Sequence, residues 1–408
     1  MAHTRGIAAL GDSEDISTWS GIPYHLLHAG VKAGFLNGGL DLRIRDFARR
    51  RWNWQFGCIL RAERPRGFQY SGAFSDLFAK RALEECSRKE LQEIISHSQV
   101  LPAGYLIRHS IKTSFYIDST LQDLFETHRM LSWLNEKTVK EAVNREIDSY
   151  RVAERVVTMS PWARMSLEHN YGIAAERIFT VLPGANLSEK DVKSTLGDAD
   201  ASAVPDRFTQ DRKFRIGFTG KDWRRKGLPR LLTAVGALNR MEIPSEVVVI
   251  GNMPQQFRDC PYVRAEGFID KSKDLSRFID IVGSCDLGCA PSHEEPMGIA
   301  PLEYLRLGVP VVCTAAGGLI GVCKAAGQAS ILLNKDATPE ELATTFEALA
   351  KNPDRLRQMR AAAWERKEYF SWDRSVKELT RIWELGLGTR SAPSTLTAHS
   401  ENAVYQDA

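Results

Sequence analysis

Apolar runs and helical periodicity alternate along most of the chain. In the first half, short apolar runs predict strands at residues 5–10, 39–44, 100–107, 113–118, 155–160 and 177–182. Apolar residues at helical spacing predict helices between them, at residues 24–33, 80–96, 126–149 and 161–169. Strands that alternate with helices are typical of βαβ units, so we expect a doubly wound α/β fold with parallel sheets.

The second half repeats this alternation after a break. From residue 187 to residue 212 the apolar periodicity disappears, which predicts an interdomain linker. Strands then follow at residues 214–220, 246–251, 263–268, 286–290, 309–314 and 331–333, with helices at 228–238, 275–282, 298–307, 339–351 and 353–369. We therefore expect Rossmann-like domains at residues 1–186 and 213–369, a terminal helix at 370–386, and a disordered tail at 387–408.

Composition narrows the class of protein. The 408 residues are 43% hydrophobic, enough for sizeable cores, and the net charge of +3 gives no reason to expect a nucleic-acid partner. The seven cysteines are scattered, and the N-terminus lacks the apolar stretch of a signal peptide. The longest weakly polar run, residues 308–323, is broken by Pro310 and Gly317 and is too short to span a bilayer. We expect a cytoplasmic protein.

A predicted helix in the second half offers a candidate anion site. The helix begins near Gly298 and is closed by Gly308, and Pro301 is tolerated only in its first turn. The free amides of Gly298, Ile299 and Ala300 would then point at a bound anion.

Two carboxylates flank this helix N-terminus. Glu295 precedes it in the loop, and Glu303 lies about one turn inside the helix. Because carboxylates repel an anion, these side chains must face another group, such as hydroxyls. Alternatively, Glu295 is solvated in the loop and Glu303 is a charge on the helix surface. The spacing fits both interpretations.

The loop after the strand at residues 214–220 is cationic. Before the next helix it carries Lys221, Arg224, Arg225 and Lys226. It is not a P-loop, because the glycine spacing and the following Ser or Thr are missing. The chain also lacks a G-x-G-x-x-G motif, so a nicotinamide-dependent dehydrogenase is unsupported. The charges are either ordinary solvated side chains or one half of a diphosphate site.

Together, the loop and the helix predict a sugar-nucleotide site. Both lie at the carboxyl ends of strands in one domain, where they would bind a diphosphate from two sides. The carboxylates beside them would hold ribose and sugar hydroxyls. Fixed cations and amides would stabilise the departing diphosphate, so we expect no metal and no other cofactor. The reaction that such a site implies is glycosyl transfer.

Other candidates lie outside this domain. Asp118 ends a predicted strand, at the sheet edge where ligands bind in α/β folds, and a glycine loop with Gly21 follows the first strand. The stretch between Arg43 and Phe56 is basic and aromatic, and it fits either a solvated helix face or a membrane-surface patch. The D-x-D pattern at residues 198–200 is better explained by the flexible linker than by a metal site.

Residues 215–322 resemble the donor-binding domain of retaining GT-B glycosyltransferases of family 4 (group 1). The pattern Glu295-x7-Glu303, followed by Leu307-Gly308-Val309-Pro310, matches the E-x7-E signature of that family. The basic loop, Gly267-Phe268-Ile269 and Ser20-Gly21-Ile22-Pro23 also resemble family motifs. The likeness extends from about residue 11 to residue 385 and is specific in the second half.

The resemblance implies two domains that face each other across a cleft, with the terminal helix crossing back to the first domain. It also assigns roles to the candidates. Glu303 would hold the ribose, and Glu295 would hold the transferred sugar. The remaining donor contacts would come from Gly21, Lys221, Lys226, Gly267, Phe268, Ile269, Met297, Gly298, Ile299 and Ala300. Catalysis would involve Glu295, Lys226 and, near the acceptor, Asp118.

Some positions depart from the family. Arginine is usual where Lys221 stands, phenylalanine at Met297, and often histidine at Asp118, so bidentate phosphate binding is lost at Lys221. The resemblance further implies retention of configuration and a sugar, glycan or lipid-linked acceptor in polysaccharide or glycoconjugate synthesis. The alternatives are a sugar-nucleotide epimerase of similar fold and a non-catalytic sugar- or membrane-binding protein.

Overall fold

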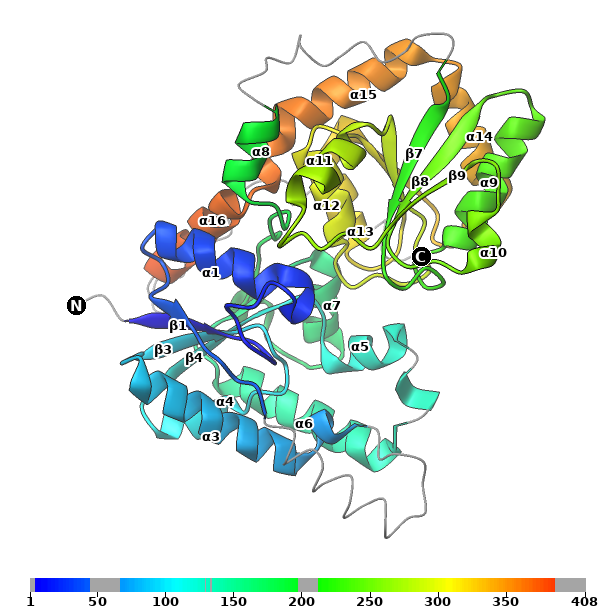
Figure 1. The fold of residues 1–408 in the computed structure, drawn as a ribbon. Coiled ribbons are helices and arrows are strands. Elements are labelled where there is room, and N and C mark those ends of the chain that lie inside the picture. The colour runs from blue at the N-terminus through cyan, green and yellow to red at the C-terminus, as the bar shows by residue number, and fades with distance from the viewer. Residues whose placement is uncertain (1–3, 45–66, 129, 133, 197–211, 386–408) are drawn as a thin grey trace. The chain divides into compact units, whose positions relative to one another are not determined.

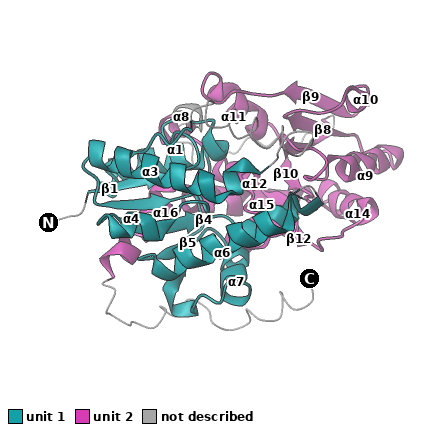
Figure 2. Ribbon diagram, turned by 90° about the horizontal axis from the view of Figure 1, so that it is seen from below, with its two compact units in different colours: residues 1–186 teal, residues 187–408 magenta. Residues whose placement is uncertain are grey.

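The computed structural model describes residues 4–44, 67–128, 130–132, 134–196 and 212–385. The chain divides into two compact units, residues 1–186 and 187–408 (Figure 2). Each unit contains a six-stranded sheet with helices on both faces (Figure 1). All strand pairs within the two sheets are parallel, which confirms the predicted doubly wound α/β fold.

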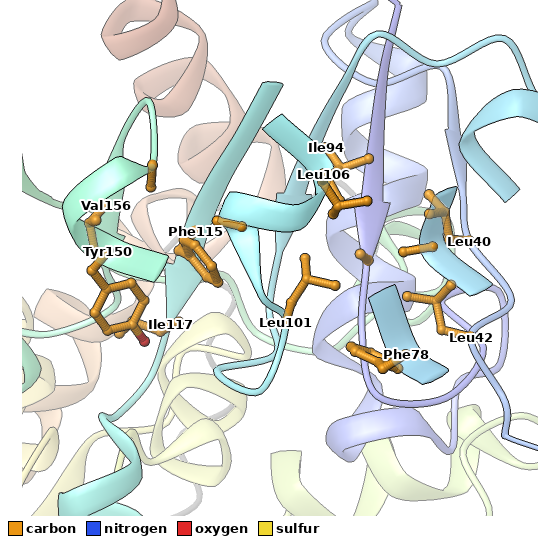
Figure 3. Close-up of a cluster of buried hydrophobic side chains, with 14 of the residues drawn as sticks. Leu40, Leu42, Phe78, Ile94, Leu101, Leu106, Phe115, Ile117, Tyr150 and Val156 are labelled. Carbon is orange, nitrogen blue, oxygen red and sulfur yellow. The ribbon is translucent and has the colours of Figure 1, made fainter. Parts of the chain in front are cut away.

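The first unit has the strand order β2-β1-β3-β4-β5-β6. Its strands are β1 (Arg5–Ala8), β2 (Gly38–Gly39), β3 (Glu93–Ser96), β4 (Lys112–Ile117), β5 (Val156–Thr158) and β6 (Ile178–Thr180). Its described α-helices are α1 (Ile22–Lys32), α3 (Gly72–Arg88), α4 (Ala103–Arg108), α5 (Leu121–Thr127), α6 (Glu136–Val152) and α7 (Pro161–His169). Apolar side chains of β3 and β4, such as Ile94 and Phe115, pack against Phe78 of α3 and Tyr150 of α6 (Figure 3).

The second unit has the strand order β12-β11-β10-β7-β8-β9. Its strands are β7 (Phe214–Thr219), β8 (Ser245–Ile250), β9 (Val263–Gly267), β10 (Leu287–Ala290), β11 (Val311–Thr314) and β12 (Ser330–Leu333). Its described α-helices are α8 (Glu189–Leu196), α9 (Leu228–Arg240), α10 (Gln255–Arg258), α11 (Leu275–Gly283), α12 (Ile299–Arg306), α13 (Leu319–Ala326), α14 (Pro339–Ala350), α15 (Pro353–Arg366) and α16 (Trp372–Glu384). Helices α9 and α14 cover one face of this sheet, and α11, α12 and α13 lie on the other (Figure 1).

The predictions for residues 80–107 were partly wrong. The helix expected at 80–96 ends at Arg88, because Glu90 adopts a left-handed conformation with φ of 53°, and residues 93–96 form β3 between β1 and β4. The strand expected at 100–107 is instead a loop followed by α4, whose Ala103 and Leu106 are buried one helical turn apart. A short apolar run does not by itself separate a buried strand from a short buried helix.

Several expected segments fall differently or outside the described residues. Part of the expected linker at 187–212 is helix α8, which buries Val192, and residues 197–211, with the D-x-D pattern, lie outside the described residues. So do residues 45–66, which hold most of the basic and aromatic stretch, and residues 386–408. Helix α16 occupies the expected terminal helix, and its crossing to the first unit stays a prediction. Among the described helices, none is both long and apolar enough to cross a membrane.

Candidate functional site

The cationic loop packs directly against the end of β10. It joins β7 to α9, and Gly227 caps α9 with φ of 75°. A Cβ atom at Gly227 would lie 1.9 Å from the carbonyl oxygen of Pro291, so only glycine fits this approach. The guanidinium of Arg230 donates a hydrogen bond to the same carbonyl at 2.7 Å. The loop is therefore fastened to the segment that leads to Glu295.

Glu295 is buried, with 8% of its surface exposed, and it faces the cations of that loop. The ammonium of Lys226 donates to Oε2 of Glu295 at 2.7 Å, and the guanidinium of Arg225 lies 3.5 Å from the same oxygen. Arg225 also donates to the carbonyl oxygen of Glu294 at 2.6 Å. Glu295 is therefore not a solvated loop carboxylate. The loop and this carboxylate, which the sequence predicted to share one site, are therefore in contact.

Helix α12 begins where the position of Pro301 requires. Gly298 caps the helix with φ of 89°, and Pro301 is its third residue, in the first turn as predicted. A Cβ atom at Gly298 would lie 2.4 Å from the side chain of Leu319 in α13. The amide of Gly318, just before α13, donates to the carbonyl oxygen of Glu295 at 3.0 Å. Helix α13, which the sequence analysis missed, thus supports the turn between Glu295 and α12.

Glu303 lies inside α12 with only 2% of its surface exposed, so the interpretation as a helix surface charge is wrong. Its Oε1 forms an ion pair with the ammonium of Lys271. Burial raises the pKa of the Glu303 carboxyl, and the charges of Lys271 and Lys226 oppose that rise. Lys271 was missed because its only sequence signal is its position two residues after Ile269.

The segment after β9 presents an exposed aromatic ring. Gly267 ends β9 with φ of 73°, Phe268 is 56% exposed, and Ile269 is buried. The ammonium of Lys221 lies 5.2 Å from the centre of the Phe268 ring. The cationic loop and the segment predicted to line a base are therefore neighbours at one edge of the sheet.

A small pocket lies beside Lys226 and the start of α12. Its lining includes Lys226, Ala300 and Pro301, and the ends of β7 and β10 close it. The hydroxyls of Thr219 and Tyr304 form a hydrogen bond of 3.1 Å beneath it. Met297, just before Gly298, is buried at 2% exposure and does not line this pocket.

The first unit holds the remaining predicted residues. Asp118 directly follows β4 and accepts a hydrogen bond from the hydroxyl of Ser119 at 3.2 Å, so its place at the strand end is as predicted. Gly21 caps α1, and Trp19 and Ser20 before it also have positive φ angles, of 45° and 58°. The side-chain amide of Asn186 donates to the carbonyl oxygen of Ser20 at 2.8 Å. The functional roles of Asp118 and Gly21 stay predictions.

Known proteins resemble the chain in sequence. Residues 200–366 match the family described as Glycosyl transferases group 1. A D-inositol 3-phosphate glycosyltransferase of Rhodococcus opacus is 26% identical over 271 residues, 62% of this chain and 58% of that protein. One from Corynebacterium kroppenstedtii is 27% identical over 259 residues, 57% of this chain and 53% of that protein. The chain thus spans little more than half the length of these curated relatives.

Solved structures resemble the fold across nearly the whole chain. Sucrose-phosphate synthase from Thermosynechococcus elongatus has a TM-score of 0.64 at 15% identity, with 93% of this chain and 98% of that chain covered. Anabaena HepE in complex with UDP has a TM-score of 0.61 at 15% identity, with 93% and 99% covered. The resemblance drawn from the motifs is confirmed: residues 200–366 match the family model of group 1 glycosyl transferases, and the chain has the GT-B fold.

Proposed function

We propose that this protein is a glycosyltransferase that moves a sugar from a nucleoside-diphosphate-sugar donor to an acceptor hydroxyl with retention of configuration. The observation that carries the proposal is the ion pair of Lys226 with the buried Glu295, on a cationic loop beside the start of α12. In support of the proposal, fixed positive charge and the amides at a helix N-terminus suit a diphosphate, and a carboxylate beside them suits the hydroxyls of a sugar. Structural neighbours solved with UDP and UDP-glucose support a nucleotide-sugar donor.

The proposed roles follow the position of each group. The diphosphate would replace Glu295 as the partner of the Lys226 ammonium, and Lys221 would add a second cation. Glu303, buried on α12, would hold the ribose, and the exposed ring of Phe268 would support the base. Glu295, released from Lys226, would accept hydrogen bonds from hydroxyls of the transferred sugar. The leaving phosphate would deprotonate the acceptor near Asp118, so no protein nucleophile is needed.

We also propose that transfer needs no metal ion, since Lys221, Lys226 and the amides of α12 can neutralise the leaving diphosphate. Transfer should then retain its rate when EDTA is added and divalent cations are omitted. Loss of activity that Mg²⁺ or Mn²⁺ restores would contradict this part of the proposal.

Product analysis tests the reaction directly. The full chain should be incubated with UDP-, GDP- and ADP-sugars and with polyol phosphates, sugars and lipid-linked sugars as acceptors, because the curated relatives are named for an inositol phosphate. NMR of the product should show the anomeric configuration of the donor. An inverted product would refute retention, and an epimerised sugar formed without acceptor would favour the epimerase instead.

The setting of the reaction is a further part of the proposal. The cysteines in the described parts of the chain are free thiols, which suits a reducing cytoplasm. The basic and aromatic stretch between Arg43 and Phe56 would contact an anionic membrane surface peripherally, with a lipid-linked acceptor within reach. Vesicles rich in anionic lipid should then retain the protein at low salt, and a failure to do so would remove the membrane from the proposal.

A further inference from the structure

Lys271 forms the direct ion pair of Glu303, the carboxylate that the proposed function assigns to the donor ribose. Lys271 follows β9 in the chain, whereas Glu303 lies on α12, so the pair joins two elements that border the candidate site. The ammonium of Lys271 also lies 4.2 Å from the centre of the Phe278 ring of α11. Three separate elements therefore meet at this one cation.

The burial of Glu303 makes this pairing consequential. A carboxyl with 2% exposure loses most of its hydration, and burial favours its neutral form. A nearby cation restores the ionised form, and only the ionised form leaves all its lone pairs free to accept hydrogen bonds. The charges that oppose neutralisation of Glu303 are those of Lys271 and Lys226, and Lys226 is hydrogen-bonded to Glu295.

The pair also leaves part of the carboxylate unused. The ammonium of Lys271 binds Oε1 of Glu303, so Oε2 is the oxygen to which adjacent ribose hydroxyls would donate. Because the ion pair already orders the carboxylate, it can accept hydrogen bonds from these hydroxyls with less loss of side-chain entropy than a mobile carboxylate would suffer.

We propose that Lys271 is a positioning residue for the donor, which holds Glu303 ionised and oriented so that the carboxylate recognises the 2′ and 3′ hydroxyls of a ribonucleoside diphosphate. The inference rests on the proposed function, and it deepens it by making Lys271 the source of selectivity for ribose over its deoxygenated forms. Lys271 acts through Glu303 and touches neither the diphosphate nor the base.

The test compares nucleotides that differ only in the ribose hydroxyls. Isothermal titration should measure the binding of UDP, GDP and ADP, and of their 2′,3′-dideoxy counterparts, to the wild-type chain and to Lys271→Met. The variant should bind the ribonucleotide about tenfold more weakly and the dideoxynucleotide within about twofold of wild type, since hydrogen bonds to a charged group contribute most of this selectivity. Lys271→Arg keeps the cation and should restore the wild-type ratio, even if Lys271→Met folds poorly.

Lys273→Met is a matched control in the same loop. Its ammonium is exposed and pairs with Asp270 at 3.5 Å, so the ribose selectivity should not change. If Lys271→Met weakens the binding of both nucleotides by the same factor, or of neither, the role of Lys271 is overturned while the proposed function stays intact. If the wild-type chain binds no nucleoside diphosphate at all, the proposed function itself fails, and the role of Lys271 fails with it.

Discussion

At the scale of single residues, the structure adds most to the sequence analysis at two carboxylates, Glu295 and Glu303. The sequence predicted that Glu295 and Glu303 flank a helix N-terminus, but their spacing fitted solvated charges equally well. Burial decides between these interpretations, because neither residue exposes more than 8% of its surface and each pairs with a lysine. The partner of Glu295 was among the predicted residues. The partner of Glu303 was not, because β9 and α12 meet only in the folded chain.

Asp118 should affect turnover without affecting the donor. It lies at the end of β4 in the first unit, whereas Lys226 and Glu303 lie in the second. Asp118→Ala should therefore leave nucleoside diphosphate binding within about twofold of wild type. Steady-state transfer with saturating donor should at the same time become at least about tenfold slower, because Asp118 is proposed to position the acceptor. If Asp118→Ala weakens donor binding as much as Lys226→Ala or Glu303→Ala does, the assignment is contradicted.

Glu146 should make stability depend on pH. Its carboxylate is fully buried in the first unit and accepts hydrogen bonds from the amide of Leu121 at 3.0 Å and the hydroxyl of Tyr150 at 2.7 Å. Burial raises its pKa from 4.5 to about 8, so its contribution to stability is complete below pH 4.5 and disappears as the pH rises through about 8.

Denaturant unfolding of the wild type and of Glu146→Gln checks this prediction. The free energy of unfolding of the wild type relative to the variant should fall as the pH rises between 4.5 and about 8. The steepest slope should approach about 1.4 kcal/mol per pH unit. A difference that stays constant across this range would show that the pKa of Glu146 is not raised.

At the scale of elements, two sequence features gave the most accurate predictions: the alternation of strands with helices, and the glycine and proline residues at helix ends. Helix α7 has the predicted bounds, and α12 begins where Gly298 and Pro301 require. Short elements were missed: β3 was absorbed into a predicted helix, α4 was taken for a strand, and helices such as α5 and α13 were not predicted. Each is a brief apolar segment whose type is decided by its neighbours in the sheet, which local sequence does not report.

Gly227 should be indispensable to the loop that carries Lys226. In Gly227→Ala the new methyl group collides with the carbonyl of Pro291, and its φ of 75° is disfavoured for alanine. We expect a lower melting temperature and at least about tenfold weaker binding of nucleoside diphosphates. Gly283→Ala, at the end of α11 with open space around its Cβ position, should change neither measurement. Similar behaviour of the two variants would refute the packing role of Gly227.

Arg306 should hold α12 in its place within the second unit. The guanidinium is 2% exposed, donates to Glu189 of α8 at 2.6 Å, and donates to Glu368 of the 3-10 helix η7 (Lys367–Phe370) at 2.9 Å. Arg306→Met should lower the free energy of unfolding by about 2 kcal/mol, less than for a fully buried pair because Glu368 is largely exposed.

Chemical denaturation with Arg357→Met as the control checks that value. Arg357 pairs with Asp354 on the surface of α15, so its loss should change the free energy of unfolding by less than about 0.5 kcal/mol. If both variants lose the same stability, Arg306 is not the clamp between these elements.

At the scale of the whole molecule, both units repeat one plan, a parallel sheet with its candidate residues after the carboxyl ends of strands. The candidate residues of the second unit were predictable because their motifs are local in sequence: the loop before α9, the segment after β9, and the residues around the start of α12. The candidate residues of the first unit were less predictable, since Asp118 and Gly21 stand alone between elements of ordinary sequence.

The binding of a nucleoside diphosphate to the full chain tests the central claim most directly. Calorimetric titration of UDP, GDP and ADP should give saturable binding of at least one nucleotide to the wild type. Lys226→Ala and Glu303→Ala should each weaken that binding at least about tenfold. Lys335→Ala, which removes a nearby half-exposed cation paired with Glu294, should leave it unchanged. No binding by the wild type, or the same affinity in all four proteins, would contradict a sugar-nucleotide site at the start of α12.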